Sequence, residues 1–245
     1  MGEGRLRQLR VVLVGTTHPG NIGSAARAMK AMGVRDLVLV APERFPHADA
    51  TALASGADDL LAAAQVVGDL PAAVADCVWV LGTSARLRTH SVPVLPPDRA
   101  AERALGQARH GPVALVFGRE HSGLTNSELD YCNAFVQVPT VPDFSSLNLA
   151  GSVQVMTYAL RMAALAAEDA PGVAPSDERD PPATQAEMEG LYAHLEQALT
   201  TIEVLDPDNP RHLMRRLRHL YQRSGLTASE VRMLRGILTH TQRGR

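Results

Sequence analysis

Four polar, glycine-rich segments of the chain have the residue types that could bind a phosphate or a nucleotide. They are residues 15–33 (GTTHPGNIGSAARAMKAMG), 82–88 (GTSARLR), 116–129 (VFGREHSGLTNSEL) and 138–155 (VPTVPDFSSLNLAGSVQV). In the first, an apolar run ends in a Gly/Pro turn before a helical pattern. The free N–H groups and the dipole of such a helix N-terminus favour an anion, which Arg27 could share. Taken alone, the same segment is consistent with Asn21 as a helix cap and Arg27 as an exposed helical arginine.

The elements around these segments predict that the segments converge. Short apolar runs at residues 10–15, 36–40, 77–81, 113–117 and 135–138 indicate the strands of a parallel sheet covered on both faces. Helical patterns at 21–33, 49–64 and 97–108 lie between them, and a helix near 146–167 follows with Leu149, Val153, Met156, Leu160 and Ala163 on one face. This alternation predicts an α/β domain whose functional site lies at the carboxyl ends of the strands.

The last third of the chain predicts a linker and a small helical extension. Residues 168–183 are acidic and proline-rich, and they separate a domain at 1–167 from a segment at 184–245. Capping boxes at Thr184–Glu187 and Thr227–Glu230 predict two helix starts, and Asn209-Pro210 predicts a third between them.

Charge is distributed unevenly behind a formal net charge of −2. Residues 168–206 hold ten acidic and one basic side chain, whereas residues 207–245 hold nine arginines and two acidic side chains. The arginine-rich end, including Arg215, Arg216 and Arg218, predicts either a nucleic-acid contact or a solvated helix face. Two widely separated cysteines and a charged N-terminus without an apolar core favour a reducing, cytoplasmic location, and no segment is apolar enough to span a membrane.

Several other chemistries are excluded by the spacing of the residues. The glycines at 15, 20 and 23 do not match the dinucleotide fingerprint, and the chain has no G-x-x-x-x-G-K-[ST] or G-x-S-x-G segment. The nine histidines show no metal-ligand spacing, so no metal site is predicted.

Taken together, the motifs resemble the SPOUT superfamily of RNA methyltransferases, which are knotted α/β proteins that use S-adenosylmethionine. The resemblance rests on GNIGSAARAMKAMG, LGTSARLRT, ALVFGREHSGLTNSEL and SSLNLAGSVQV, and it covers nearly the whole chain. The SLNLA form and the C-terminal segments HLEQAL (194–199) and RGIL (235–238) are similar to the bacterial branch that methylates the ribose 2′-oxygen of the cytidine or uridine at position 32 of the tRNA anticodon loop. His18, Pro19 and His121 depart from the family pattern only within loops.

The resemblance implies roles for individual residues. Arg27 would be the catalytic arginine, with Ser146 and Asn148 beside it. The cofactor-binding residues would be Thr83, Ser84, Ala85, Gly118, Val138, Ser145, Ser146 and Leu147. The tRNA contacts would include Arg86, Arg88, Arg215, Arg216 and Arg218. The resemblance also implies a trefoil knot made by threading residues 139–167, and a homodimer whose site uses both subunits.

The chemistry of methyl transfer leaves the proton acceptor open. The 2′-oxygen must be aligned with the methyl group and must lose its proton. The family resemblance implies Arg27 as the base, helped by a phosphate, but a guanidinium stays protonated near neutral pH. An Arg27 that holds the RNA phosphate and polarises the hydroxyl, with water or Ser146 as the proton carrier, is physically easier, and the sequence does not choose between the two. Two alternatives remain at this point, which are a methyltransferase of the same fold that acts on another RNA such as rRNA, and a catalytically idle RNA-binding protein. The joint presence of Arg27, Ser146 and Asn148 favours an enzyme.

Overall fold

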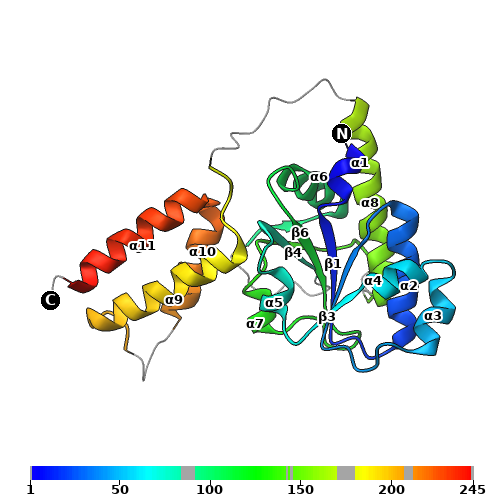
Figure 1. Cartoon of the computed structure of the whole chain (residues 1–245), viewed down its shortest axis with the longest axis horizontal. Helices are drawn as coiled ribbons and strands as arrows, with labels where there is room; N and C mark the ends of the chain where they lie inside the picture. The colour runs from blue at the N-terminus through cyan, green and yellow to red at the C-terminus, as the bar shows by residue number, and fades with distance from the viewer. Residues whose placement is uncertain are drawn as a thin grey trace.

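The computed structural model describes residues 2–83, 92–141, 143, 146–169, 180–206 and 212–243. Its first part is a seven-stranded parallel sheet with the strand order β3-β2-β1-β6-β4-β7-β5 (Figure 1). The strands are β1 (Leu9–Val14), β2 (Asp36–Val40), β3 (Gln65–Val67), β4 (Trp79–Thr83), β5 (Val94–Leu95), β6 (Val113–Phe117) and β7 (Ala134–Val136). The predicted parallel α/β fold is therefore confirmed.

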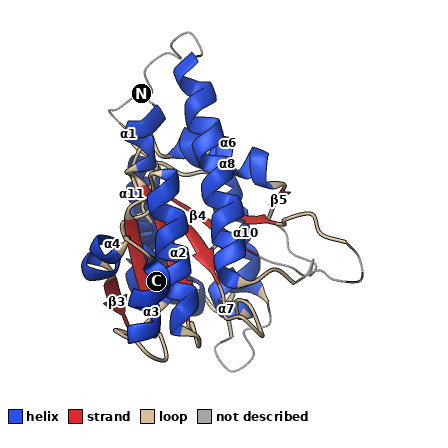
Figure 2. Cartoon of the chain, turned by 90° about the vertical axis from the view of Figure 1, so that its right-hand side faces the viewer, coloured by secondary structure: helices blue, strands red, loops and turns tan. Residues whose placement is uncertain are grey.

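Helices cover both faces of the sheet because its strands are apolar on both sides. They are α1 (Gly2–Leu6), α2 (Pro19–Met32), α3 (Ala48–Ala54), α4 (Asp58–Ala63), α5 (Leu70–Val74), α6 (Pro97–Gln107), α7 (Asn126–Leu129) and α8 (Leu149–Asp169). On one face, Val11 and Leu13 pack with residues of α2, α6 and α8, and Figure 2 looks onto α2 and α8 with the strands behind them. On the other face, Val12 and Val14 pack with residues of α5 and α7.

Local differences from the predicted elements have simple causes. The strands at 36–40 and 113–117 lie where they were predicted, but β3 and β5 were not predicted, because they have three and two residues and are partly exposed. The single helix predicted at 49–64 is wrong. The chain forms α3 and α4 instead, separated by Ser55 and Gly56, which both have a positive φ.

Three C-terminal helices, α9 (Gln185–Thr201), α10 (Leu213–Ser224) and α11 (Ala228–Arg243), lie together beside the sheet (Figure 1). Their own apolar cluster includes Met188, Leu191, Tyr192, Leu195 and Val231. Both predicted capping boxes form, since Thr184 exchanges hydrogen bonds with Glu187, and Thr227 with Glu230. The helix start predicted at Asn209-Pro210 falls on residues that lie outside the described part of the chain. Within the description, α10 begins at Leu213 after His212.

Parts of the predicted linker and of the predicted knot lie outside the described residues. Helix α8 extends to Asp169, two residues into the segment predicted as linker, and residues 170–179 lie outside the description. The predicted knot involves residues 139–167, of which 142, 144 and 145 are likewise outside it, so the knot stays a prediction. No helix within the described residues has the length and apolar character needed to cross a membrane.

Candidate active site

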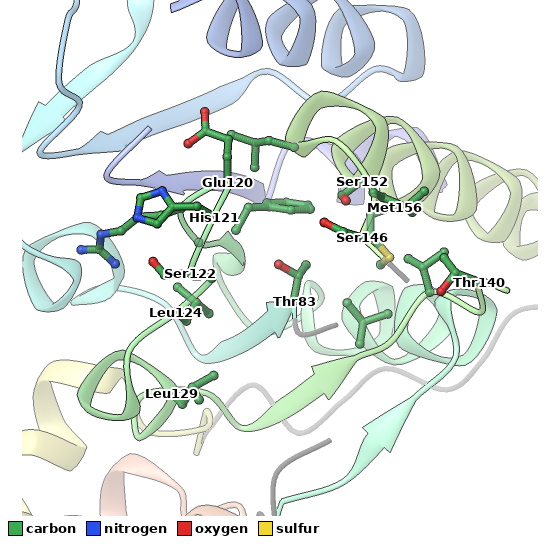
Figure 3. Close-up of a pocket in the computed structure, with 18 residues that line it drawn as sticks. Thr83, Glu120, His121, Ser122, Leu124, Leu129, Thr140, Ser146, Ser152 and Met156 are labelled. Carbon is green, nitrogen blue, oxygen red and sulfur yellow. The ribbon is translucent and has the colours of Figure 1, made fainter. Parts of the chain in front are cut away.

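A cavity of about 230 Å³ lies where β4, β6 and β7 end and α8 begins (Figure 3). Apolar side chains line part of it, namely Phe117, Leu124, Leu129, Val136, Leu149 and Met156. Polar side chains line the rest, including Thr83, Glu120, Thr140, Ser146 and Ser152. The cavity therefore offers an apolar surface next to several hydroxyl groups, at the carboxyl edge of a parallel sheet.

Five of the predicted cofactor-binding residues line this cavity. They are Thr83, Gly118, Val138, Ser146 and Leu147, which come from three separate segments of the chain. The other three, Ser84, Ala85 and Ser145, lie outside the described residues, as do Arg86 and Arg88. The structure thus brings the described members of the predicted set together, while their role as cofactor ligands stays a prediction.

Gly118 lets the chain turn tightly over the cavity. A Cβ atom at this position would lie 2.2 Å from the backbone carbonyl carbon of Gly123 and 2.4 Å from the nitrogen of Leu124. The turn is closed by two backbone hydrogen bonds between Arg119 and Gly123, of 3.2 and 2.9 Å. Any larger residue at 118 would displace the backbone that lines the cavity.

Arg119 and Glu128 hold this turn against α7. The Arg119 guanidinium donates two hydrogen bonds to the Glu128 carboxylate, of 3.0 and 3.1 Å. Glu128 also accepts a hydrogen bond from the backbone N–H of Thr125, and the Thr125 side chain accepts one from Glu128 N, which completes a capping box. Burial alone would raise the pKa of Glu128, but the hydrogen bonds from Arg119 and Thr125 outweigh it and lower that pKa.

Glu120 occupies the N-terminus of α2. Its carboxylate accepts hydrogen bonds from the backbone N–H groups of Thr17 (3.2 Å) and His18 (3.3 Å) and from the Asn21 side chain (2.9 Å). Burial tends to raise the pKa of Glu120, whereas these donors lower it, and the net shift is downward. The protein's own carboxylate therefore lies just before α2, where a phosphate was considered, and phosphate binding at this helix N-terminus stays a prediction.

Asn148 connects α2 with the start of α8. Its side-chain N–H donates a 3.0 Å hydrogen bond to the side-chain oxygen of Asn21, and its own side-chain oxygen accepts from the backbone N–H of Ala150 at 2.9 Å. Asn148 thus caps the N-terminus of α8. The cap of α2 that was considered for Asn21 is not formed, since the residue before α2 is His18, whose side chain makes no capping hydrogen bond. Although Asn148 does not line the cavity, it fixes the chain two residues after Ser146, which does.

Arg27 lies away from the cavity of its own chain. It is exposed on α2, it is not a lining residue, and within the described residues its side chain makes no hydrogen bond or ion pair. The exposed Arg27 side chain can therefore contact a partner molecule. Within one chain, Arg27 does not share the cavity that Ser146 lines. Its catalytic role stays a prediction.

The three predicted RNA-binding arginines of α10 differ in their surroundings. Arg218 forms an ion pair with Glu189 and lies over the ring of Tyr192, with 4.3 Å from its guanidinium carbon to the ring centre, so its side chain is used within the protein. Arg215 donates a 2.9 Å hydrogen bond to Asp130. Arg216 is exposed, and no partner for its side chain occurs in the described part of the chain. The geometry favours an RNA contact only for Arg216.

Glu120 and Glu128 were not predicted as part of the site. The sequence marks them only as acidic residues in a polar turn after a strand. Their donors on α2 and in the capping box become apparent only when the fold is known.

Comparison with known proteins identifies relatives along the whole chain. Residues 8–158 match the SpoU rRNA Methylase family, and residues 186–245 match the C-terminal domain of the tRNA methyltransferase TrmJ. The tRNA (cytidine/uridine/adenosine-2′-O-)-methyltransferase TrmJ of Pseudomonas aeruginosa is 54% identical over 97% of this chain and 95% of its own length. The corresponding cytidine/uridine enzyme of Cronobacter sakazakii is 45% identical over 98% of each chain. The crystal structure of TrmJ from Z. mobilis superposes with a TM-score of 0.81 at 35% identity, covering 94% of this chain and 97% of that one.

Proposed function

Because the chain belongs to the SpoU methylase family and is similar to TrmJ proteins over nearly its whole length, we propose that it methylates the ribose 2′-hydroxyl of tRNA. The methyl donor in this proposal is S-adenosylmethionine, and the target is the cytidine or uridine at position 32 of the anticodon loop. The observation that carries the proposal is the convergence of Thr83, Gly118, Val138, Ser146 and Leu147 on one cavity.

The cavity residues fit such a cofactor. Adenine needs an apolar surface with nearby backbone N–H and C=O groups, and Leu124, Leu129 and Val136 lie beside the turn that starts at Gly118. The ribose and the amino-acid part need hydroxyl partners, and Thr83, Ser146 and Ser152 supply them at the cavity wall. The Cβ-free backbone at Gly118 lets the turn at Gly123 and Leu124 close tightly at the cavity wall.

The residues of the chain have separate tasks in this reaction. When bound, the cofactor supplies a methyl group on a positively charged sulfonium. Ser146, which lines the cavity, has a hydroxyl Oγ that can accept the proton of the ribose 2′-hydroxyl while passing its own to water. Arg27 presents a charged, planar guanidinium that can hold an RNA phosphate in two hydrogen bonds. Glu120, Asn21 and Asn148 are positioning residues, because they hold the first turns of α2 and α8 together.

The position of Arg27 supports a site built by two subunits. In the proposed homodimer, Arg27 of the partner subunit faces the cavity that Arg27 of the same chain does not line. Tyr158, Met162 and Leu165 form an exposed apolar stripe on α8, with exposed fractions of 54%, 47% and 38%. Because such a stripe is unfavourable in water, it supports burial against a second copy. A cytoplasmic location completes the proposal, since both cysteines are free thiols in the fold.

Mapping of 2′-O-methyl groups tests the proposal. Total RNA, containing both tRNA and rRNA, from a strain lacking the protein is incubated with the purified chain and S-adenosylmethionine, and the modified positions are compared with an untreated sample. Calorimetry measures the binding of S-adenosylmethionine separately. We expect new methylation at ribose 32 only. Methylation of rRNA but not of tRNA would show that the substrate is rRNA. Binding of S-adenosylmethionine without any methyl transfer would indicate an idle RNA-binding protein.

A further inference from the structure

A second cavity, of about 260 Å³, lies between the sheet domain and the C-terminal helices. Its walls include Val78 and Trp79 at the start of β4 and Asn133 just before β7. These residues are at the amino ends of their strands, whereas the candidate active site is at the carboxyl ends. The two cavities therefore lie at opposite edges of the sheet and share no lining residue among those the structure describes.

The charge of this junction cavity favours an anion. Arg103, His110 and Arg223 line it, and no aspartate or glutamate does so within the described ranges. Arg223 is exposed on α10, and its side chain makes no hydrogen bond or ion pair with any other described residue. The Arg103 guanidinium carbon lies 5.6 Å from the centre of the Trp79 ring. Arginines without a carboxylate partner are suited to two-pronged hydrogen bonding with a phosphate.

One wall of the cavity contains an acceptor that lacks a donor. The side-chain oxygen Oε1 of Gln222 is buried, and no hydrogen bond reaches it from the described residues. Exchange of the oxygen and nitrogen of this amide would not help, because Nε2 donates a 2.7 Å hydrogen bond to the backbone oxygen of Asp130. A buried acceptor without a partner costs free energy, so the packing at this junction leaves one polar group of the chain unsatisfied among the described residues.

The remaining lining is suited to a planar heterocycle. Met188, Tyr221 and Leu226 provide apolar and aromatic contacts on the side of the C-terminal helices, whereas Trp79 on the side of the sheet is buried to 4% exposure and borders the cavity with little of its surface. Gln107 adds an amide group on α6. A nucleobase combines a flat apolar face with N–H donors on its edge, and its phosphate carries the negative charge that the arginines favour.

From these observations we infer that the junction cavity binds a nucleoside monophosphate, with the base against Tyr221, Met188 and Leu226 and the phosphate at Arg103 and Arg223. The unit is either an unpaired nucleotide of the RNA substrate or a free nucleotide. The first source rests on the proposed function, since it requires that the chain binds RNA. A nucleotide here would also join the sheet domain to the C-terminal helices, because its partners come from both.

Trp79 makes the inference directly testable, since it is the only tryptophan of the chain and lines this cavity. The full-length protein is titrated with cytidine monophosphate, with cytidine, and with tRNA, while its tryptophan fluorescence is recorded. Saturating S-adenosylhomocysteine is present throughout, so that the candidate active site does not contribute. Arg223→Ala removes the phosphate partner. Arg232→Ala is the matched control, because Arg232 is an exposed arginine of the neighbouring helix α11 that does not line the cavity.

We expect cytidine monophosphate to change the fluorescence in a saturable way. The apparent Kd should rise about tenfold in Arg223→Ala, as expected for a lost charge-assisted hydrogen bond, and stay unchanged in Arg232→Ala. Cytidine should bind more weakly than its monophosphate. If tRNA changes the fluorescence but cytidine monophosphate does not, and Arg223→Ala abolishes the change at saturating tRNA, the ligand is a nucleotide of the RNA. No response of Trp79 to either ligand, or a response that Arg223→Ala leaves unchanged, overturns the inference. Methylation by the wild-type protein, measured separately, tests the proposed function without reference to Trp79.

Discussion

The Asn21 side chain donates a 2.9 Å hydrogen bond to the Glu120 carboxylate, although 99 residues separate the two along the chain. Asn21 lies in the first turn of α2, and Glu120 lies in the turn after β6 that lines the candidate active site. The same Asn21 side chain accepts a 3.0 Å hydrogen bond from Asn148, which caps α8. One short chain of side chains therefore fixes three segments of the site relative to one another.

Replacement of Glu120 by glutamine should weaken this arrangement. The two carboxylate oxygens accept from Thr17, His18 and Asn21, and glutamine would place an N–H₂ group against one of these donors. We expect the free energy of unfolding to fall by about 1–3 kcal/mol, the usual cost of an unsatisfied buried donor. Chemical denaturation measures the change, with Glu102→Gln at an exposed position of α6 as the control. Equal losses in the two variants would contradict the prediction.

Acid should destabilise the protein through Glu120 and Glu128. The pKa of each is lower in the folded chain than its ordinary value of about 4.3, so the stability they contribute is present above that pH. It is lost as the pH falls through the folded-state pKa values, because the unfolded chain then binds more protons than the folded one. Unfolding curves from pH 6 to 3 should show this loss, with a shallower slope in Glu120→Gln. An identical pH profile in that variant would argue against the assignment.

Interactions between near neighbours in sequence were predicted well. The capping boxes at Thr184 and Thr227 form as expected, because both partners lie within one helical turn. A third box, between Thr125 and Glu128, has the same spacing but was not predicted, because its helix has only four residues and shows no apolar periodicity.

Contacts between distant segments could not be predicted from residue patterns. The sequence of α2 suggests that its N-terminus could hold an anion, and nothing in that sequence indicates that the Glu120 carboxylate accepts hydrogen bonds from His18 and Asn21 there. Likewise, the cluster of arginines in α10 gives no sign that Arg218 pairs with Glu189 of α9 while Arg216 faces solvent. Convergence of the strand ends was predictable, since it follows from a parallel sheet, but the partners of individual charges depend on the packing of helices.

Gly118→Ala should damage the candidate active site. The added Cβ would lie 2.2 Å from a backbone carbon, and backbone atoms cannot give way as a flexible side chain does. We expect a loss of stability of about 1–3 kcal/mol and at least about tenfold weaker binding of S-adenosylmethionine. Calorimetry measures both. Gly106→Ala is the control, because a Cβ at this position of α6 meets no atom within 4 Å, and the variant should be as stable as the wild type or more so.

The arginines of α10 should separate into two classes. Arg218→Ala breaks an ion pair and removes the cation from the Tyr192 ring, so it should destabilise the protein by about 1–3 kcal/mol. Arg216→Ala should leave stability unchanged, weaken tRNA binding, and reduce the slope of log K against log salt by about 0.7–0.9 for one lost phosphate contact. Thermal unfolding and binding titrations at several salt concentrations distinguish them. An unchanged salt slope in Arg216→Ala would leave this face of α10 as a solvated surface.

Arg27 provides the sharpest test of the proposed chemistry, because it is exposed and makes no described contact within its own chain. A surface arginine without a role would tolerate Arg27→Ala, since such changes usually alter stability by less than about 0.5 kcal/mol. As the proposed phosphate-binding residue of a shared site, the same variant should fold and bind S-adenosylmethionine normally but lose most methyl transfer. Arg27→Lys should not restore it, because a lysine ammonium cannot reproduce the planar two-pronged contact.

Single-turnover assays with saturating cofactor and tRNA separate the loss of chemistry from a loss of binding. Arg109→Ala, at an exposed arginine just after α6, is the control and should keep the wild-type rate. Mixing the Arg27→Ala protein with the Gly118→Ala protein adds a second test. In a mixed dimer, the Arg27→Ala chain has an intact cavity and the Gly118→Ala chain has an intact Arg27. If each site is shared between subunits, the mixture should therefore regain methyl transfer. An Arg27→Ala rate above about a tenth of the wild-type value corresponds to a barrier change below about 1.4 kcal/mol, and it would rule out a catalytic role for this residue.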